Sequence, residues 1–245
     1  MHVPLTPDQD AYGQIYLAIL EGHAAQEIME RDDGLIYSGD PADYFAPFRR
    51  WPVAERRAMR AVRGRVLDIG CGAGRVSLHL QSRGHEVVAI DESPLAVQVA
   101  ARRGVRQAQV CSLGALDPAL GIFDTILLLR NNFGLVGEES SVARLLQQLT
   151  TLTSVRGRII TDSVDPERVD DPVFREYHIA NNQAFRPRAQ RYRVRWQKYA
   201  TPWFDYLMFS PAEMEQIIAG SGWHVARFID DGTPRYLAVL EKQHA

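Results

Sequence analysis

Three glycines and a carboxylate lie close together near residue 70. Residues 66–69 read Val-Leu-Asp-Ile, and Gly70, Gly72 and Gly74 follow at alternate positions, with Asp68 two residues before the first glycine. Glycine is needed where a turn requires a positive φ or where a ligand must touch the backbone. The amphipathic run that follows indicates a helix start, which offers free N–H groups. We therefore expect a ligand-binding loop between a buried strand and a helix.

The spacing of the glycines separates two kinds of ligand. A dinucleotide fingerprint requires Gly-x-Gly-x-x-Gly, and its third glycine would fall where this chain has Arg75. The carboxylate of Asp68, near the strand end, is out of place beside a pyrophosphate and suits a cationic ligand. A general Rossmann turn remains the alternative interpretation.

The stretch Val66-Leu-Asp-Ile-Gly-Cys-Gly-Ala-Gly-Arg75 resembles motif I of the class I S-adenosylmethionine (SAM) dependent methyltransferases. The resemblance covers about residues 62–164 and 210–242. It implies S-adenosyl-L-methionine as the cofactor, S-adenosyl-L-homocysteine as the product, and no metal. It also implies that the loop backbone of Gly70, Cys71, Gly72 and Gly74 holds the methionine part, with Asp68 near its amino group.

The next candidate follows the second expected strand. Asp91 comes 21 residues after Gly70, and its carboxylate can accept hydrogen bonds from both ribose hydroxyls. Its alternative role is that of an acidic partner for the dipole of the following helix. Glu92 and Ser93 come next and would border the adenine.

Two further strand ends supply the remaining cofactor candidates. Ser112 stands where many family members carry an Asp for the adenine amino group, and Leu113 lies beside it. The fourth strand ends in Arg130-Asn131-Asn132-Phe133, where Arg130 and Asn131 are candidates for the methionine end of the cofactor. A simple turn is the alternative there. Enzymes that methylate base amines in DNA usually show Asn/Asp-Pro-Pro-aromatic at this place, so the missing prolines disfavour that activity.

Composition sets broad limits on the class of protein. The chain has 245 residues, 46% of them hydrophobic and 24% charged, with a net charge of -2. These values suit one globular α/β domain with an elaboration and give no general attraction to nucleic acid or membranes. Two cysteines are too few for a disulfide framework. The first residues lack a secretory pattern, so we expect a cytoplasmic protein. We expect it to be a monomer or a homodimer.

The periodicity alternates strand and helix, which predicts a parallel sheet with crossover helices. Strands are expected at 66–69, 86–90, 105–110, 123–129 and 157–161, with helices at 74–83, 94–103 and 138–153. Residues 223–229 and 236–240 flank a turn and predict a C-terminal antiparallel hairpin. The fold class is therefore α/β, a Rossmann-like, doubly wound, mostly parallel seven-stranded sheet. The expected domains are an N-terminal helical cap or lid (1–62) and a SAM-binding domain (63–245) with an insertion at 165–209.

The acceptor pocket is the part that no motif fixes. In the family, the N-terminal segment and the insertion usually form it, and irregular aromatic stretches fall in those two places here. The candidate lining consists of Tyr12, Tyr37, Tyr44, Asn132, Phe133, His178 and Trp203. A base is needed only if the acceptor holds a proton at neutral pH, and His178 ranks first for that role. Core aromatics and a surface histidine are the alternative.

Four functions remain open. The first is a methyltransferase that moves a methyl group to a small molecule by in-line displacement. The second acts on RNA or protein, which the basic residues Arg188, Arg191, Arg193 and Arg195 would favour; their alternation also fits a half-solvated edge strand. An NAD-dependent oxidoreductase and a SAM-binding protein without catalysis complete the set. The net charge disfavours nucleic acid.

Overall fold

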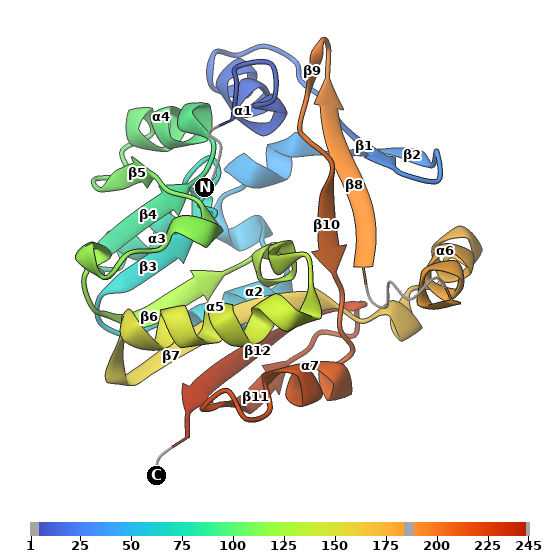
Figure 1. Ribbon diagram of the computed structural model, residues 1–245. Helices are drawn as coiled ribbons and strands as arrows, with labels where there is room; N and C mark the ends of the chain where they lie inside the picture. The colour runs from blue at the N-terminus through green and yellow to red at the C-terminus, as the bar shows by residue number, and fades with distance from the viewer. Residues whose placement is uncertain (1–4, 184–188, 244–245) are drawn as a thin grey trace. The chain divides into compact units, whose positions relative to one another are not determined.

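The computed structural model of the protein describes residues 5–183 and 189–243. Its contacts divide the chain into two compact units that interleave along the sequence. The described residues within 1–51, 64–117 and 192–203 form unit 1. Those within 52–63, 118–191 and 204–245 form unit 2. Figure 1 labels the elements of both units.

Unit 1 contains the strands around the glycine loop. Strand β3 (Val66–Ile69) pairs in parallel with β4 (Val87–Asp91), which pairs in parallel with β5 (Ala108–Val110). Every residue of β3 is buried, as its continuous apolar run predicts for a sheet covered on both faces. Helix α3 (Arg75–Ser82) starts after Gly74, and α4 (Pro94–Arg102) starts at a serine cap followed by proline. Strand β5 is shorter than the expected 105–110.

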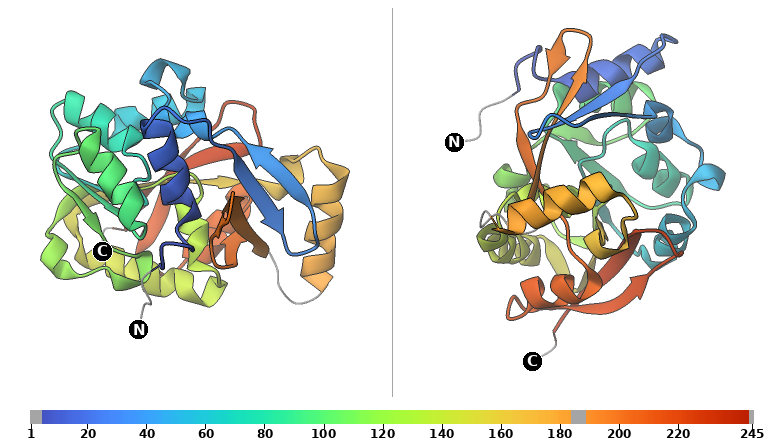
Figure 2. Two further views of the ribbon diagram at one scale, coloured as in Figure 1. Left: turned by 90° about the horizontal axis from the view of Figure 1, so that it is seen from above. Right: turned by 90° about the vertical axis from the view of Figure 1, so that its right-hand side faces the viewer.

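The N-terminal part of unit 1 contains strands in addition to the helix that the sequence predicts. Helix α1 (Ala11–Leu20) is followed by an antiparallel hairpin of β1 (Glu27–Arg31) and β2 (Ile36–Gly39), and then by two 3-10 turns, η1 (Pro41–Phe45) and η2 (Phe48–Arg50). Strand β1 also pairs with β8 (Ala189–Trp196), which pairs with β9 (Tyr199–Ala200); Figure 2 shows this ribbon from two further sides. The buried face of β1 carries Glu27, Met29 and Arg31. Because two of these three residues are charged, the alternation of apolar and polar residues does not reveal the strand.

Unit 2 contains the second half of the strands. Strand β6 (Phe123–Leu128) pairs in parallel with β7 (Thr153–Val164), and β12 (Arg235–Lys242) lies antiparallel to both β7 and β11 (Trp223–Ile229). The C-terminal hairpin is thus present, while β7 starts earlier than the expected residue 157. Helices α5 (Glu139–Thr151) and α7 (Pro211–Ile218) pack against each other (Figure 1). Helix α2 (Val53–Ala58), helix α6 (Pro172–Gln183) and strand β10 (Phe204–Leu207) complete the unit.

The strand order of the main sheet is β11-β12-β7-β6-β3-β4-β5. The β11–β12 hairpin and the β7–β12 pairing are antiparallel, whereas β3–β4, β4–β5 and β6–β7 are parallel, so the predicted fold class is confirmed. The division into a cap (1–62) and a SAM-binding domain (63–245) stays a prediction. Among the described residues, no helix combines the length and the apolar character needed to cross a membrane.

Candidate functional site

The glycine loop follows β3 in a conformation that requires glycine. Gly70, Gly72 and Gly74 have φ values of 72°, 53° and 78°. A Cβ atom on Gly74 would lie 2.7 Å from Val105 Cγ2, so this residue also allows close packing of the loop. The backbone N–H groups of Gly70 and Cys71 both donate to the Ile90 carbonyl, at 2.8 and 3.0 Å. These two N–H groups are already engaged and are not offered to a phosphate.

Asp91 joins the glycine loop to the start of α4. Its Oδ2 accepts the Gly72 N–H at 2.8 Å, and its Oδ1 accepts the Ser93 N–H at 2.9 Å. Burial raises the pKa of this carboxyl to about 6, against the lowering effect of the two hydrogen bonds. Each carboxylate oxygen can accept a second hydrogen bond, so the geometry leaves capacity for hydroxyl donors.

Two other candidates of the motif are buried in the structure. Asp68 is buried within β3 and accepts a hydrogen bond from Ser77 Oγ at 2.5 Å. Cys71 is a buried free thiol, and burial raises its pKa well above the usual value. A thiol that stays protonated is a weak nucleophile, so Cys71 is a packing residue of the loop rather than a reactive one.

The residues after β4 and β5 differ in how their polar groups are used. Ser93 is buried, donates its hydroxyl to Asp10 at 2.6 Å and caps α4 by accepting the Ala96 N–H at 2.8 Å. Glu92 is exposed and Leu113 is half-buried. Ser112 is 5% exposed, and its Oγ finds no hydrogen-bond partner among the described residues. A buried hydroxyl without a partner is costly and indicates a place for a polar ligand group.

Helix α1 is held tightly to the start of α4. Asp10 caps α1 by accepting the Gly13 N–H at 3.0 Å, and the same side chain accepts the Leu95 N–H at 3.2 Å. A Cβ atom on Gly13 would lie 2.5 Å from Ser93 Oγ and 2.6 Å from Leu95 Cβ. The glycine therefore allows the close approach of the two elements. Figure 1 shows α1 beside α4.

This placement brings tyrosines of α1 to the glycine loop. The ring of Tyr16 covers Gly72, with its hydroxyl 3.4 Å from where a Cβ on that glycine would be. Tyr44 packs edge-on against Tyr16 at 5.0 Å between ring centroids, and Tyr12 lies 6.0 Å from Tyr16. Tyr12 and Tyr44 each donate a hydroxyl to Oε1 of the buried Glu27, both at 3.3 Å. We call these three tyrosines and Glu27 the tyrosine cluster.

Two arginines near the loop stack on aromatic rings. Arg103 donates to the Ala73 carbonyl and stacks over Phe45, with Cζ 4.5 Å from the ring centroid. Arg75 stacks over Trp51 at 4.2 Å. Both contacts keep cationic groups against aromatic faces. Arg75, which replaces the third glycine of a dinucleotide fingerprint, thus serves as a packing residue at the start of α3.

In unit 2, the turn after β6 has an unusual backbone. Arg130 and Asn131 both have φ of 64°, a region that residues other than glycine adopt at a cost. Asn131 is buried; its N–H donates to Asp162 Oδ1 at 2.8 Å, and its Nδ2 donates to the Leu207 carbonyl at 3.2 Å. Its Oδ1 has no partner among the described residues. Asp162 also forms an ion pair with Arg235.

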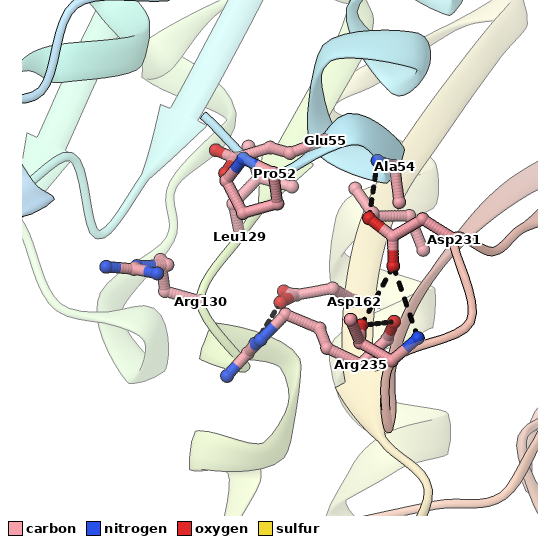
Figure 3. A pocket seen from close by; sticks show the side chains of 10 residues that line it. Pro52, Ala54, Glu55, Leu129, Arg130, Asp162, Asp231 and Arg235 are labelled. Carbon is pink, nitrogen blue, oxygen red and sulfur yellow. Dashed lines mark hydrogen bonds and ion pairs between the residues drawn. The ribbon is translucent and has the colours of Figure 1, made fainter. Parts of the chain in front are cut away.

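A cavity of about 180 Å³ lies beside this turn (Figure 3). Figure 3 shows Arg235 reaching toward Asp162 and Asp231 reaching toward the Ala54 N–H, which donates to Asp231 at 2.9 Å. Polar side chains that line the cavity thus already bind to other lining residues. The ten lining residues are Pro52, Ala54, Glu55, Leu129, Arg130, Asp162, Asp231, Thr233, Arg235 and Leu237.

The remaining candidates for the acceptor pocket are spread over both units. In unit 2, Asn132 is half-buried, Phe133 is buried against Phe209, and His178 is half-buried on α6 and outside the set that lines the cavity. In unit 1, Tyr37 is 43% exposed and packs edge-on against Tyr192, while Trp203 packs under Arg193 at 4.7 Å. Of the seven candidates, the described contacts bring only Tyr12 and Tyr44 to the neighbourhood of the glycine loop.

Two basic side chains of strand β8, Arg193 and Arg195, form ion pairs within unit 1. Arg193 makes two hydrogen bonds of 2.8 Å with Glu30, and Arg195 reaches the same carboxylate at 3.2 Å. Tyr192 and Val194, which alternate with these two arginines, are buried, as the alternation predicts for a half-solvated strand. Arg188 lies outside the described residues. The pairing with Glu30 reduces the positive charge that this face presents to an acidic partner.

Three site residues escaped the sequence analysis. Tyr16 lies in the apolar helical spacing of α1 and reads there as core. Glu27 lies in a strand that the hydrophobicity pattern does not reveal. Asp162 stands inside the apolar run of β7, where a lone carboxylate in a buried strand was the available signal.

Comparison with known proteins shows what this site is similar to. Residues 66–157, from β3 into β7, match the family model of a methyltransferase domain. A SAM-dependent methyltransferase from Bacteroides fragilis, solved with S-adenosyl-L-homocysteine, superposes with a TM-score of 0.84 at 26% identity over 99% of this chain and 98% of that one. The resemblance to class I SAM-dependent methyltransferases that motif I predicted is confirmed, and with it the SAM cofactor that this family uses.

Two curated relatives match a shorter stretch. The magnesium-protoporphyrin O-methyltransferase of Rhodobacter capsulatus is 40% identical over 67 residues, which are 26% of this chain and 30% of that protein. The 2-heptyl-1-hydroxyquinolin-4(1H)-one methyltransferase of Mycobacteroides abscessus is 32% identical over 71 residues, 26% of this chain and 31% of that protein. The match thus spans about a third of the length of these relatives.

Proposed function

We propose that this protein is a SAM-dependent methyltransferase that acts on a small-molecule acceptor. The observation that carries the proposal is the arrangement in which Asp91 ties the glycine loop to α4 and keeps spare acceptor capacity for ribose hydroxyls. Ser112, with its buried and unpartnered hydroxyl, supplies a polar contact for the adenine. Gly70, Cys71, Gly72 and Gly74 would support the methionine part, with Glu92, Ser93 and Leu113 bordering the nucleoside and Arg130 and Asn131 contributing from the turn after β6.

The proposed reaction does not require the protein to form a covalent bond with either reactant. When bound, the cofactor would supply an electrophilic methyl group on a sulfonium; the acceptor atom would attack the methyl carbon in line, and sulfur would keep the electron pair of the broken C–S bond. The chain's own residues then act by position. The glycine loop fixes one reactant and the residues around it fix the other, so that proximity and alignment provide most of the rate enhancement. His178 remains the proposed base for acceptors that need one.

Small acceptors are favoured over macromolecules by two features. Arg193 and Arg195 of β8 pair with Glu30, which reduces the positive charge that they offer to a phosphate backbone. Both curated relatives act on small molecules according to their names. A monomer or homodimer in the cytoplasm remains our expectation, and an NAD-dependent oxidoreductase is the rival that the engaged N–H groups of the glycine loop disfavour.

The activity test measures formation of S-adenosyl-L-homocysteine from SAM in the presence of three acceptor pools. The pools are a library of small molecules, total RNA and unfolded protein. We expect turnover with the small-molecule pool alone, and a loss of that turnover in Asp91→Ala, with Glu21→Ala as the control at an exposed carboxylate. Turnover with RNA or protein instead would contradict the acceptor class.

A further inference from the structure

The cavity of unit 2 lies at the carboxyl ends of two parallel strands. Leu129 and Arg130 directly follow β6, and Asp162 lies near the end of β7. In open α/β sheets, ligands bind at this edge. We propose that the cavity receives the acceptor and that Arg235 holds a carboxylate group of that molecule. The inference rests on the proposed function, because it names the substrate class of that same reaction.

The turn after β6 connects the cavity with the proposed cofactor contacts. Arg130 and Asn131 both have φ of 64°, a conformation that costs free energy for residues other than glycine. Arg130 lines the cavity, and Asn131 is one of the residues proposed to contact the cofactor. Strained backbone of this kind is concentrated at ligand sites. A molecule in the cavity is therefore next to the turn that would contact the cofactor.

Arg235 is oriented by one carboxylate and keeps donors for another. Its Nη1 donates to Oδ2 of Asp162, and its Nε and Nη2 have no partner among the described residues. Asp162 is buried and accepts the Asn131 N–H at 2.8 Å, so it holds the guanidinium in one orientation (Figure 3). The arginine side chain is 35% exposed, so a ligand can reach it. Its Nε and Nη2 present two parallel N–H groups, which match the two oxygens of a carboxylate.

The other charged residues of the lining are engaged within the chain. Both oxygens of Asp231 accept hydrogen bonds, one from a backbone N–H and one from the Thr233 hydroxyl, each at 2.9 Å. Glu55 and Arg130 also interact with other groups, so we assign the ligand to Arg235. Three acidic residues line the cavity in total, which favours a carboxylate with a single negative charge over a phosphate with two.

The size of the cavity and its apolar residues define the rest of the ligand. The cavity measures about 180 Å³, and an apolar cavity of about 150 Å³ is large enough to bind benzene. We expect a ring of that size to pack against the apolar residues of the lining, which are Pro52, Ala54, Leu129 and Leu237. A small aromatic carboxylate is therefore the class of acceptor that fits. Arg235 is a specificity-determining residue that binds the acceptor and takes no part in the bond changes of the transfer.

The test compares two probes of similar size, benzoate and benzamide, which differ in charge. Each is titrated calorimetrically at neutral pH into the protein saturated with S-adenosyl-L-homocysteine. We expect benzoate to bind about ten-fold more tightly, because hydrogen bonds between two charged groups are stronger than those to a neutral amide. In the turnover assay with the small-molecule pool, benzoate should inhibit methylation and benzamide should inhibit it less.

Variants of the ion pair locate the binding site. Asp162→Asn combined with Arg235→Met removes both charges, so that no buried charge is left unpaired, and it should bind the two probes equally. Arg168→Met removes another arginine of unit 2, which pairs with Asp230, and it should keep the preference for benzoate. If the double variant does not fold, Arg235→Lys keeps a cation beside Asp162 but lacks the second pair of donors. It should lower the preference to about three-fold, the effect of losing one hydrogen bond.

The possible outcomes separate this inference from the proposed function. Benzoate that binds no more tightly than benzamide, or a preference that persists in the double variant, overturns the role of Arg235. Benzoate that binds without inhibiting turnover overturns the role of the cavity as the acceptor site. In these cases, binding of S-adenosyl-L-homocysteine and turnover of the pool still support the proposed function. Absence of that binding or of that turnover in the wild type would contradict both.

Discussion

The turns after β3 and β6 are each held by a carboxylate but use different residues. In unit 1, Asp91 accepts the Gly72 N–H at 2.8 Å, and in unit 2, Asp162 accepts the Asn131 N–H at 2.8 Å. Positive φ values accompany both contacts, but glycines adopt them in the first turn and Arg130 and Asn131 in the second. The first turn is therefore free of strain and readable from sequence, whereas the second depends on tertiary contacts to hold a costly backbone.

The two carboxylates also differ in their second partner. Asp91 Oδ1 accepts a backbone N–H of Ser93, while Asp162 forms an ion pair with Arg235. The backbone donors leave Asp91 with capacity for ligand hydroxyls, since each of its oxygens can accept twice. The arginine engages Asp162 in an internal ion pair. We therefore propose that the first turn binds the ligand and that Asp162 has a structural role in the second.

The largest effect is expected when the glycine conformation of the first turn is broken. Gly74→Ala places a methyl group 2.7 Å from Val105 and forces alanine to a φ of 78°. Strain and overpacking together should lower the free energy of unfolding by about 2–4 kcal/mol. Gly84→Ala is the control, because its φ of 91° is also positive but open space surrounds it, so it should lose about 1–2 kcal/mol. Urea denaturation of both variants checks this, and equal losses would contradict the packing argument.

A smaller effect is expected at the ion pair of the second turn. Arg235→Met leaves the buried carboxylate of Asp162 without its cation, and because the arginine side chain is 35% exposed we expect a loss of about 1–2 kcal/mol. Arg168→Met is the matched control in unit 2, since Arg168 and Asp230 form a more exposed pair whose loss should matter less. Thermal unfolding of both variants measures the difference. A larger loss in Arg168→Met would show that the buried pair is not what stabilises the turn.

The raised pKa of Asp91 predicts how the first turn responds to pH. Burial raises this pKa to about 6, above the value of an unfolded carboxyl, so the stability contribution of the protonated form is lost as pH rises through about 6. Cofactor binding runs the other way, because the ionised carboxylate is the better acceptor for ribose hydroxyls. We expect the affinity for S-adenosyl-L-homocysteine to fall up to ten-fold for each pH unit below about 6.

The control for the pH dependence is Asp91→Asn, which cannot ionise. Its affinity should be lower at neutral pH and nearly constant between pH 5 and 7, within the range where calorimetry is practical. Asp162→Asn changes the carboxylate of the second turn and should keep the wild-type pH profile. A profile that persists in Asp91→Asn would assign the titration to another group.

The smallest effect tests the strain in the second turn. Arg130→Gly replaces a residue at φ 64° by one that adopts this conformation freely, and we expect a gain of about 0.5 kcal/mol after the entropy of the unfolded glycine is counted. Chemical denaturation at neutral pH measures the change. A loss greater than 1 kcal/mol would mean that contacts of the arginine side chain outweigh the backbone strain.

The sequence predicted the parts of the molecule in which local pattern and fold agree. The apolar runs of β3 and β4, the serine-proline start of α4 and the glycine spacing all reflect local requirements of strand, helix and loop. The fold class and the cofactor followed from them. The limits of β5 and β7 were less accurate because their patterns mix polar and apolar residues.

The parts of the structure that the sequence did not predict depend on contacts between residues far apart in the chain. Strand β1 buries Glu27 and Arg31, so no periodicity reveals it, and the tyrosine cluster forms only when this strand meets α1. The strained turn at Arg130 and Asn131 contains no glycine at these positions, so the sequence does not predict its positive φ values. His178, the sequence candidate for a base, remains a prediction that no described contact links to the glycine loop.

The most direct measurement is a calorimetric titration of the wild type and of Asp91→Ala with S-adenosyl-L-homocysteine, with NADH as the control ligand. We expect micromolar binding of S-adenosyl-L-homocysteine, no comparable binding of NADH, and at least a ten-fold loss of affinity in Asp91→Ala, because a hydrogen-bonded charge in the site is removed. Tighter binding of NADH, or no binding of S-adenosyl-L-homocysteine, would contradict the methyltransferase account and leave a general Rossmann loop.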